Sequence, residues 1–186
     1  GLEVRDLSRS TDPDLCTAGR CLDEILSREL GRIAQAGTGD TVVVLHQLGN
    51  HGPAYFRRYP ANMGRFEPAC AHEDLRNCSR EEIVNAYDNA IAYTDHFLAQ
   101  VIRQLDTWRD RYDVAMVYAS DHGESLGEKG LYLHGMPYAI APDEQLHVPM
   151  LWWLPTATAA AMGFDEQCFR ATASRNVSHD HLYHTI

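Results

Sequence analysis

The chain has 186 residues and a formal net charge of −10 at pH 7, from 26 Asp and Glu against 16 Lys and Arg. Its 45% hydrophobic content is typical of a folded domain rather than of a disordered segment. General nucleic-acid binders neutralise phosphates with Lys and Arg, so the acidic balance argues against that class. No run of about 18 apolar residues occurs, and we therefore expect no bilayer-spanning segment within the chain.

The two ends of the sequence predict a piece of a longer protein. Gly1 stands where an initiator Met would, and no signal-like apolar segment follows it. Near the other end, Ser178 has the character of a helix N-cap, but only about two helical turns fit between it and Ile186. We expect residues 1–186 to form a single domain that has been cut from this longer protein.

The first half of the chain holds one predicted helix, one predicted strand and an irregular segment. Apolar residues recur at helical spacing over residues 22–36. Residues 41–45 form a continuous β-branched run, which predicts a strand covered on both faces in a parallel sheet. Residues 55–77 lack sustained periodicity, and we expect an ordered insertion pinned by the loop between Cys70 and Cys78.

A long amphipathic helix and two more strands are predicted in the second half. Ser79 and Glu82 form a capping box, and an apolar stripe continues from there for about seven turns. Residues 114–119 and 147–154 are predicted strands, with Pro149 near the start of the second, where a missing N–H is tolerated. Helices and strands thus alternate, which predicts an α/β fold with a mostly parallel sheet and helices on both faces.

The five cysteines form two close pairs and one single residue. Cys16 lies near Cys21, Cys70 lies near Cys78, and Cys168 stands alone. Short loops rich in turn formers and charges suit disulfides in an oxidising compartment, although free thiols of a cytosolic protein fit the spacing too. A zinc site is less favoured, because neither pair has the usual two-residue gap.

Candidate metal ligands gather in the loops that follow the predicted strands. His51 follows the first strand, Asp121 and His122 follow the second, and His134 lies further along the same segment. Loops at the carboxyl ends of parallel strands meet at one edge of a sheet, where ligands bind. Asp oxygen and His nitrogen are ordinary zinc donors, and Gly123 permits the bend that lets neighbours share an ion. The alternative is that each histidine is a loop residue whose ring bonds to backbone.

Four blocks of sequence carry a family resemblance. They are Asn50-His51-Gly52-Pro53-Ala54-Tyr55-Phe56-Arg57-Arg58-Tyr59-Pro60, Tyr87-Asp88-Asn89, Ser120-Asp121-His122-Gly123-Glu124-Ser125-Leu126-Gly127-Glu128 and Leu131-Tyr132-Leu133-His134-Gly135-Met136-Pro137-Tyr138-Ala139. In this order the blocks resemble the lipid A phosphoethanolamine transferases, which include the mobile colistin-resistance enzymes. The similarity runs from about Cys16 to the C-terminus, and the Asp-His-Gly element is shared more widely across the alkaline phosphatase superfamily.

The resemblance implies an alkaline phosphatase/sulfatase-like fold that is truncated at its N-terminal side. The chain would be the C-terminal portion of a periplasmic catalytic domain, and the full-length enzyme would be anchored in the bacterial inner membrane by helices absent here. That enzyme would use zinc to move phosphoethanolamine from phosphatidylethanolamine to lipid A through a phosphothreonine intermediate, an activity tied to polymyxin resistance.

The resemblance also implies roles for individual residues. By position, Asp121 and His122 match zinc ligands, while His51 and His134 match catalytic residues that bind the transferring phosphate or a second zinc. Glu124 lies close to them but is assigned no role. The nucleophilic threonine and a further glutamate ligand of the family precede the matched part. We therefore expect this chain alone to be inactive and to bind zinc weakly.

The resemblance extends to the cysteines, and it leaves other activities of the superfamily open. Cys16 with Cys21, and Cys70 with Cys78, match disulfides of the family, which favours the oxidising compartment. The alternatives to a transferase are a sulfatase or phosphodiesterase-type hydrolase of the same superfamily and an inactive periplasmic binding module.

Overall fold

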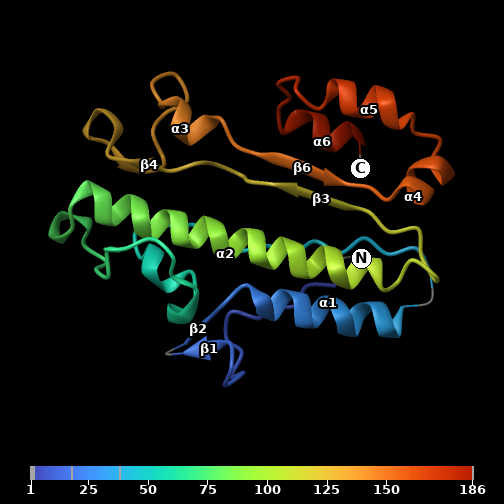
Figure 1. The fold of residues 1–186 in the computed structure, drawn as a ribbon, viewed down its shortest axis with the longest axis horizontal. Helices are drawn as coiled ribbons and strands as arrows, with labels where there is room; N and C mark the ends of the chain where they lie inside the picture. The colour runs from blue at the N-terminus through green and yellow to red at the C-terminus, as the bar shows by residue number, and fades with distance from the viewer. Residues whose placement is uncertain (1–2, 18, 38, 186) are drawn as a thin grey trace. The chain divides into compact units, whose positions relative to one another are not determined.

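The computed structural model describes residues 3–17, 19–37 and 39–185, and the chain divides into two compact units (Figure 1). The first unit comprises Gly1–Val101 and Leu126–Leu133, and the second comprises Ile102–Ser125 and His134–Ile186. Among the described residues, no helix combines the length and the apolar character needed to cross a membrane.

Helix α1 (Glu24–Ala36) begins the regular structure of the first unit, after a short antiparallel pair of β1 (Cys16–Thr17) and β2 (Arg20–Cys21). The helix confirms the prediction over residues 22–36. A disulfide joins Cys16 to Cys21 across the strand pair. This bond closes the loop that leads into α1.

Helix α2 (Arg80–Asp106) is the longest element in Figure 1, and its last residues are counted with the second unit. The capping box is confirmed, because Ser79 N donates to Glu82 Oε2 at 2.6 Å and Glu82 N donates to Ser79 Oγ at 3.2 Å. The buried face of the helix is formed by Ile83, Ala86, Asn89, Ala90, Tyr93, Thr94, Phe97 and Val101. The predicted stripe therefore holds for most positions, but Ile91 is exposed.

The irregular segment before α2 is ordered, as predicted. It contains the 3₁₀ turns η1 (Tyr55–Arg57), η2 (Ala61–Met63) and η3 (Leu75–Asn77). A second disulfide joins Cys70 to Cys78. Tyr55, Cys70, Ile83 and Ala86 are buried together, so this disulfide belongs to the core under α2. Burial of these apolar groups stabilises the segment that leads to the helix.

The predicted strand over residues 41–45 is wrong for this chain. These residues are extended but belong to no strand, and Val42 and Val44 are 80% and 84% exposed. A β-branched run favours extended backbone, but a strand also needs a hydrogen-bonded neighbour. No sheet among the described residues includes this run.

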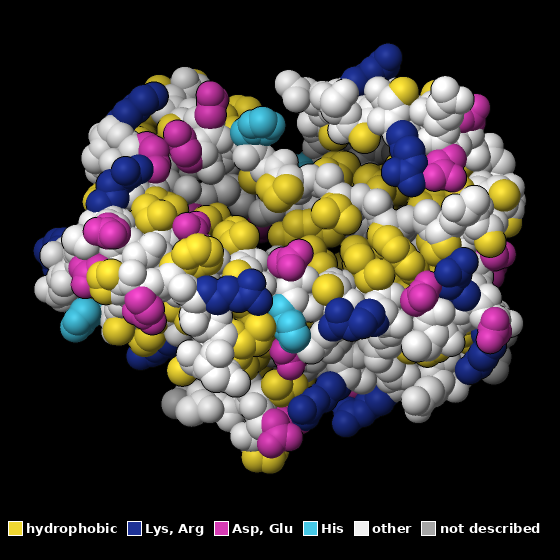
Figure 2. Space-filling view, viewed as in Figure 1, with side chains coloured by type: hydrophobic (Ala, Val, Ile, Leu, Met, Phe, Trp, Pro, Cys, Tyr) yellow, Lys and Arg dark blue, Asp and Glu magenta, His cyan; other side chains and the backbone are white. Residues whose placement is uncertain are grey.

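A short hairpin lies between α2 and the end of the chain. Strand β4 (Ser125–Leu126) pairs with β5 (Tyr132–Leu133) around the turn η4 (Glu128–Gly130). Arg80 reaches this hairpin within the first unit and pairs with Glu128 at 2.8 Å. Figure 2 shows Lys and Arg side chains interspersed with Asp and Glu on the face drawn there.

The second unit contains the strand pair β3 (Met116–Ala119) and β6 (Met150–Trp153). Both predicted strands are confirmed, but the prediction of a mostly parallel sheet is wrong for this pair, which is antiparallel with Met116 opposite Trp153 (Figure 1). A parallel pair needs a long crossover, usually a helix. The intervening chain supplies only the hairpin and the four-residue helix α3 (Asp143–Leu146).

Three short helices follow β6 in the second unit. They are α4 (Thr156–Ala161), α5 (Glu166–Thr172) and α6 (Asp180–Thr185). Phe169 of α5 packs edge-on against Trp152 of β6, with ring centroids 5.9 Å apart. The helix expected after Ser178 is confirmed as α6.

Candidate metal and phosphate site

The loop after β3 carries Asp121 and His122 and is held by backbone contacts within the second unit. His122 N donates to Asp121 Oδ1 at 3.0 Å, and Gly123 N donates to Gln145 O at 3.0 Å. A Cβ at position 123 would lie 2.0 Å from the carbonyl oxygen of Glu144. Only glycine therefore permits this close approach of the loop to α3.

Asp121 and His122 present two donors that fit one zinc ion. Asp121 is 82% exposed, and its Oδ2 lies 3.9 Å from His122 Nε2. Zinc bonds of about 2.0–2.2 Å allow two donors at roughly this separation to share an ion. The Nδ1 atom of His122 lies 3.0 Å from the carbonyl oxygen of Gly123. Because a carbonyl only accepts, Nδ1 carries the proton and Nε2 keeps the lone pair that binds metals.

His134 lies beside His122 in the same unit. The two rings stack with centroids 4.0 Å apart, and ring nitrogens of the two residues lie within 4.8 Å of each other. Nδ1 of His134 lies 3.2 Å from Oε1 of Glu124, whose side chain is only 4% exposed. A carboxylate also only accepts, so Nδ1 of His134 carries the proton and Nε2 keeps the lone pair.

The backbone just before His134 is unusual. Leu133 adopts a φ of +65°, in the left-handed region that bulky residues rarely occupy. Such conformations are found disproportionately at functional sites, where the surrounding structure enforces them. This observation supports a functional assignment of the segment around His134.

His51 belongs to the first unit and has the same ring arrangement. Its Nδ1 lies 2.7 Å from the carbonyl oxygen of Gly52, which leaves Nε2 as the acceptor nitrogen. The preceding loop is fixed by Asp23, whose carboxylate accepts from Leu48 N at 3.0 Å and Gly49 N at 2.8 Å. Burial raises the pKa of Asp23 despite these bonds.

Gln145 of α3 is a buried residue that links the parts of the second unit around His122 and His134. Its Nε2 donates to Ser125 Oγ at 2.9 Å, and its Oε1 accepts from Met136 N at 3.3 Å. Gly123 N also donates to the backbone oxygen of Gln145. Gln145 therefore contacts three segments, at Gly123, Ser125 and Met136. No motif or spacing in the sequence marks Gln145 or the contact of Glu124 with His134, and neither could be predicted.

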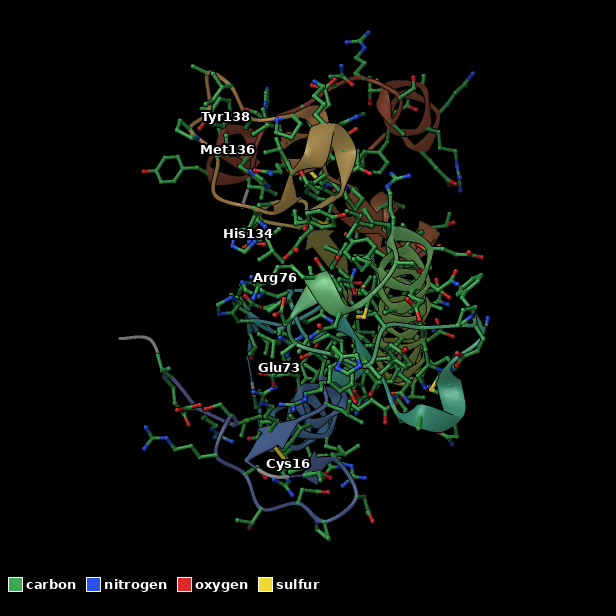
Figure 3. All side chains as sticks on the ribbon, turned by 90° about the vertical axis from the view of Figure 1, so that its left-hand side faces the viewer. Cys16, Glu73, Arg76, His134, Met136 and Tyr138 are labelled. Atoms are coloured by element: carbon green, nitrogen blue, oxygen red, sulfur yellow. A yellow bond between two sulfur atoms is a disulfide. The ribbon has the colours of Figure 1, made fainter. Side chains whose placement is uncertain are left out.

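The first unit also has a cavity of about 600 Å³ beside the loop closed by Cys70 and Cys78. It is lined by Pro53, Glu73, Asp74, Leu75, Arg76, Cys78, Tyr132 and Leu133, of which Figure 3 labels Glu73 and Arg76. Hydrogen bonds from the Arg76 side chain lower the pKa of Asp74 to about 2. The carboxylate of Asp74 is therefore ionised at neutral pH.

Comparison with known proteins identifies the family. The sulfatase family matches residues 2–186. The chain is 43% identical over 175 residues to the phosphoethanolamine transferase EptA of Salmonella typhimurium, covering 94% of this chain and 32% of that protein. It is 45% identical over 160 residues to the phosphatidylethanolamine transferase Mcr-1 of Escherichia coli, covering 84% and 30%. The chain thus spans about a third of the length of these curated relatives.

Solved structures agree with this assignment. The soluble domain of lipooligosaccharide phosphoethanolamine transferase A from Neisseria meningitidis superposes with a TM-score of 0.91 at 41% identity, covering 96% of this chain and 54% of that one. The C-terminal periplasmic domain of phosphoethanolamine transferase EptC from Campylobacter jejuni gives a TM-score of 0.71, also at 41% identity, covering 76% and 46%. The chain therefore belongs to the sulfatase family, has its alkaline phosphatase/sulfatase-like fold, and is similar along nearly all of its length to phosphoethanolamine transferases.

Proposed function

We propose that the protein carrying this chain is a zinc-dependent transferase that moves phosphoethanolamine from phosphatidylethanolamine to lipid A. It would act on the periplasmic face of the bacterial inner membrane, held there by an N-terminal anchor outside this chain. The observation that carries the proposal is the arrangement of Asp121, His122 and His134, in a chain 43% identical to a phosphoethanolamine transferase. The disulfides support an oxidising compartment.

In this proposal Asp121 and His122 supply part of the zinc site. A bound zinc ion would polarise phosphoryl oxygens and lower the pKa of an attacking hydroxyl. The backbone contacts of the loop, above all the one at Gly123, hold the two residues side by side, with Asp121 Oδ2 3.9 Å from His122 Nε2. A structural or catalytic zinc site has three or four protein ligands. Because His51 and His134 are assigned to the phosphate in this proposal, the remaining ligands would come from segments outside this chain.

His51 and His134 would bind the phosphoryl group that is transferred. As an imidazolium, His134 would donate Nε2–H to a phosphate oxygen while its Nδ1–H stays bonded to Glu124. His51 would do the same while its Nδ1–H stays bonded to the carbonyl of Gly52. Both rings are thus oriented before a substrate arrives, which reduces the cost of forming the charged transition state.

The nucleophile would be a threonine outside this chain, which would form a phosphothreonine intermediate. Covalent catalysis divides a two-substrate transfer into two displacements. In the first, the threonine oxygen attacks the phosphorus of phosphatidylethanolamine, the bond to the glycerol oxygen breaks, and diacylglycerol leaves with a proton. In the second, a phosphate of lipid A displaces the threonine and receives the group.

The test is a product analysis with the intact, zinc-loaded protein, phosphatidylethanolamine vesicles and lipid A. We expect mass spectrometry to detect lipid A carrying an added phosphoethanolamine group. His122→Ala should lower the rate at least about 100-fold, because it removes a ligand of the ion that stabilises developing charge. His72→Ala, at an exposed histidine of the first unit, is the matched control and should change the rate little.

Two outcomes would overturn the proposal. Release of free phosphoethanolamine without modified lipid A would identify a hydrolase of the same superfamily. Absence of any turnover, with phosphatidylethanolamine still bound, would identify a binding module.

A further inference from the structure

An uncharged, exposed loop follows His134 in the second unit. Residues 135–142 contain no Asp, Glu, Lys or Arg, although the chain as a whole has 26 acidic residues. Within it, residues 135–141, here called the apolar tip, expose Tyr138 by 84% and Ile140 by 64%. Figure 3 shows Met136 and Tyr138 at the outer edge of the ribbon in that view, beyond His134 on the same loop.

The apolar tip is fixed at its base and closed by its own backbone. Ile140 N and Ala141 N both donate to Pro137 O at 2.9 Å, which forms a compact turn. Met136 N donates to the buried side chain of Gln145 at 3.3 Å, and Pro142 at the other end is buried. The two large apolar side chains therefore project from an anchored turn rather than from a loose segment.

This backbone arrangement distinguishes the apolar tip from the exposed apolar run at residues 41–45. Val42 and Val44 lie in an extended run that belongs to no described sheet, and an exposed extended segment favours pairing with another strand. In the tip, Pro137 has no N–H, and the N–H groups of Ile140 and Ala141 are bonded within the turn. Each backbone group that is bonded in this way is one that a low-dielectric environment does not leave without a partner, because lipid offers none.

We propose that the apolar tip inserts Tyr138 and Ile140 into the headgroup and acyl boundary of a phospholipid bilayer. Tyr favours this boundary, where its ring is buried and its hydroxyl stays wet. The absence of carboxylates on the tip avoids repulsion from anionic lipids, which most of this acidic chain would experience. The inference rests on the proposed function, because contact of this loop with a bilayer assists catalysis only if the substrate is a membrane lipid.

The position of the tip makes this contact useful for catalysis. His134, the proposed phosphate ligand, directly precedes Gly135 at the start of the tip. A loop anchored at headgroup depth would hold His134 near the depth of a phospholipid phosphate. Insertion would then raise the chance of capturing a donor from the membrane without changing the chemistry at the phosphate.

The first experiment compares two donors with the intact, zinc-loaded protein. The variant is Tyr138→Ser combined with Ile140→Ser, and the control is Met162→Ser combined with Val177→Ser, two exposed apolar residues of the same unit. For phosphatidylethanolamine in vesicles, we expect the variant to lose at least about tenfold in kcat/KM, the size expected from removing two apolar anchors. For a short-chain, water-soluble phosphatidylethanolamine, we expect a change of less than about twofold.

The outcomes separate this inference from the proposed function. Equal losses on both donors, or no loss on vesicles, would overturn the role of the tip. If the unsubstituted protein turns over neither donor, the proposed function itself fails, and only the lipid-contact measurement below then decides the inference. Circular dichroism and the melting temperature of the variant show whether a loss reflects misfolding.

The second experiment measures the lipid contact directly. An environment-sensitive fluorophore is placed on Tyr138→Cys in a Cys168→Ser background, which removes the exposed free thiol. With vesicles of phosphatidylethanolamine and phosphatidylglycerol that contain nitroxide-labelled lipid, we expect strong quenching at this position. The same label on Met162→Cys should show little quenching. Equal quenching at both positions, none at either, or a signal that depends on protein concentration without lipid, as a second copy would give, would overturn the inference.

Discussion

Hydrogen-bond acceptors fix the proton on each candidate histidine. The Nδ1 atoms of His51 and His122 face the carbonyl oxygens of Gly52 and Gly123, and the Nδ1 atom of His134 faces the carboxylate of Glu124. None of these oxygens can donate, so in each neutral ring Nε2 is left to bind a metal or accept a proton. Metal-binding histidines are commonly oriented in this way.

Of these acceptors, only Glu124 can be removed by substitution. Glu124→Ala should lower kcat/KM of the intact enzyme about 10–100-fold, because His134 loses the partner that orients its ring. Glu124→Gln keeps an oxygen that accepts from Nδ1 and should recover most of the activity. Glu144→Ala, at an exposed position of α3, is the control. If Glu124→Gln were as damaging as Glu124→Ala, the carboxylate would act by its charge and not by orienting the ring.

The sequence identified donors but not their partners. His51, Asp121, His122 and His134 could be selected because metal-binding residue types follow predicted strands next to glycines. The contact between Glu124 and His134 spans ten positions through a hairpin, and no periodicity encodes it. The assignment of His51 and His134 to the phosphate remains a prediction.

At the scale of elements, helices were predictable and strand pairing was not. The bounds of α1 and α2 follow from apolar spacing and the capping box, which are local signals. The relative direction of β3 and β6 depends on the path of the chain that connects them. Residues 41–45 show that a β-branched run can remain outside any described sheet. Hydrophobic runs specify an extended backbone but not the partner strand.

The buried face of α2 includes Asn89, a polar residue that the apolar periodicity does not predict to be buried. Asn89 is fully buried, and its Oδ1 accepts from Arg65 N at 2.6 Å and Phe66 N at 2.9 Å. Its Nδ2 donates to Phe66 O at 3.0 Å and to the hydroxyl of Tyr59 at 3.2 Å. The side chain therefore satisfies the backbone of the irregular segment, which explains why an amide occupies an apolar face.

Replacement of Asn89 tests whether its side chain stabilises the irregular segment through these hydrogen bonds. Asn89→Leu should lower the free energy of unfolding by about 3–5 kcal/mol, because the N–H groups of Arg65 and Phe66 and the carbonyl of Phe66 lose their partner at a fully buried position, at about 1–3 kcal/mol each. Asn85→Leu on the same helix, which loses one exposed bond to Pro68, should cost less than about 1 kcal/mol. Urea denaturation of both variants gives the comparison, and similar losses for the two would contradict the assigned role.

At the scale of the whole molecule, the cysteines divide between the two units. Both disulfides lie in the first unit, where they close the loop before α1 and the loop under α2. Each closes a short loop, so the loop-entropy account gives about 2–3 kcal/mol apiece. Cys168 in the second unit is exposed and free. The first unit therefore depends on an oxidising environment more than the second does.

The metal-binding capacity of the chain alone provides the last test. Asp121 and His122 supply two donors, whereas a zinc site that contributes about 10–16 kcal/mol has four ligands. We expect calorimetric titration of this chain with zinc at neutral pH to give a Kd above about 1 µM, which corresponds to less than about 8 kcal/mol. His122→Ala should weaken even this binding, while His72→Ala should not. A tight site with one zinc per chain would show that these residues form a complete site, and the proposed ligands outside the chain would then be unnecessary.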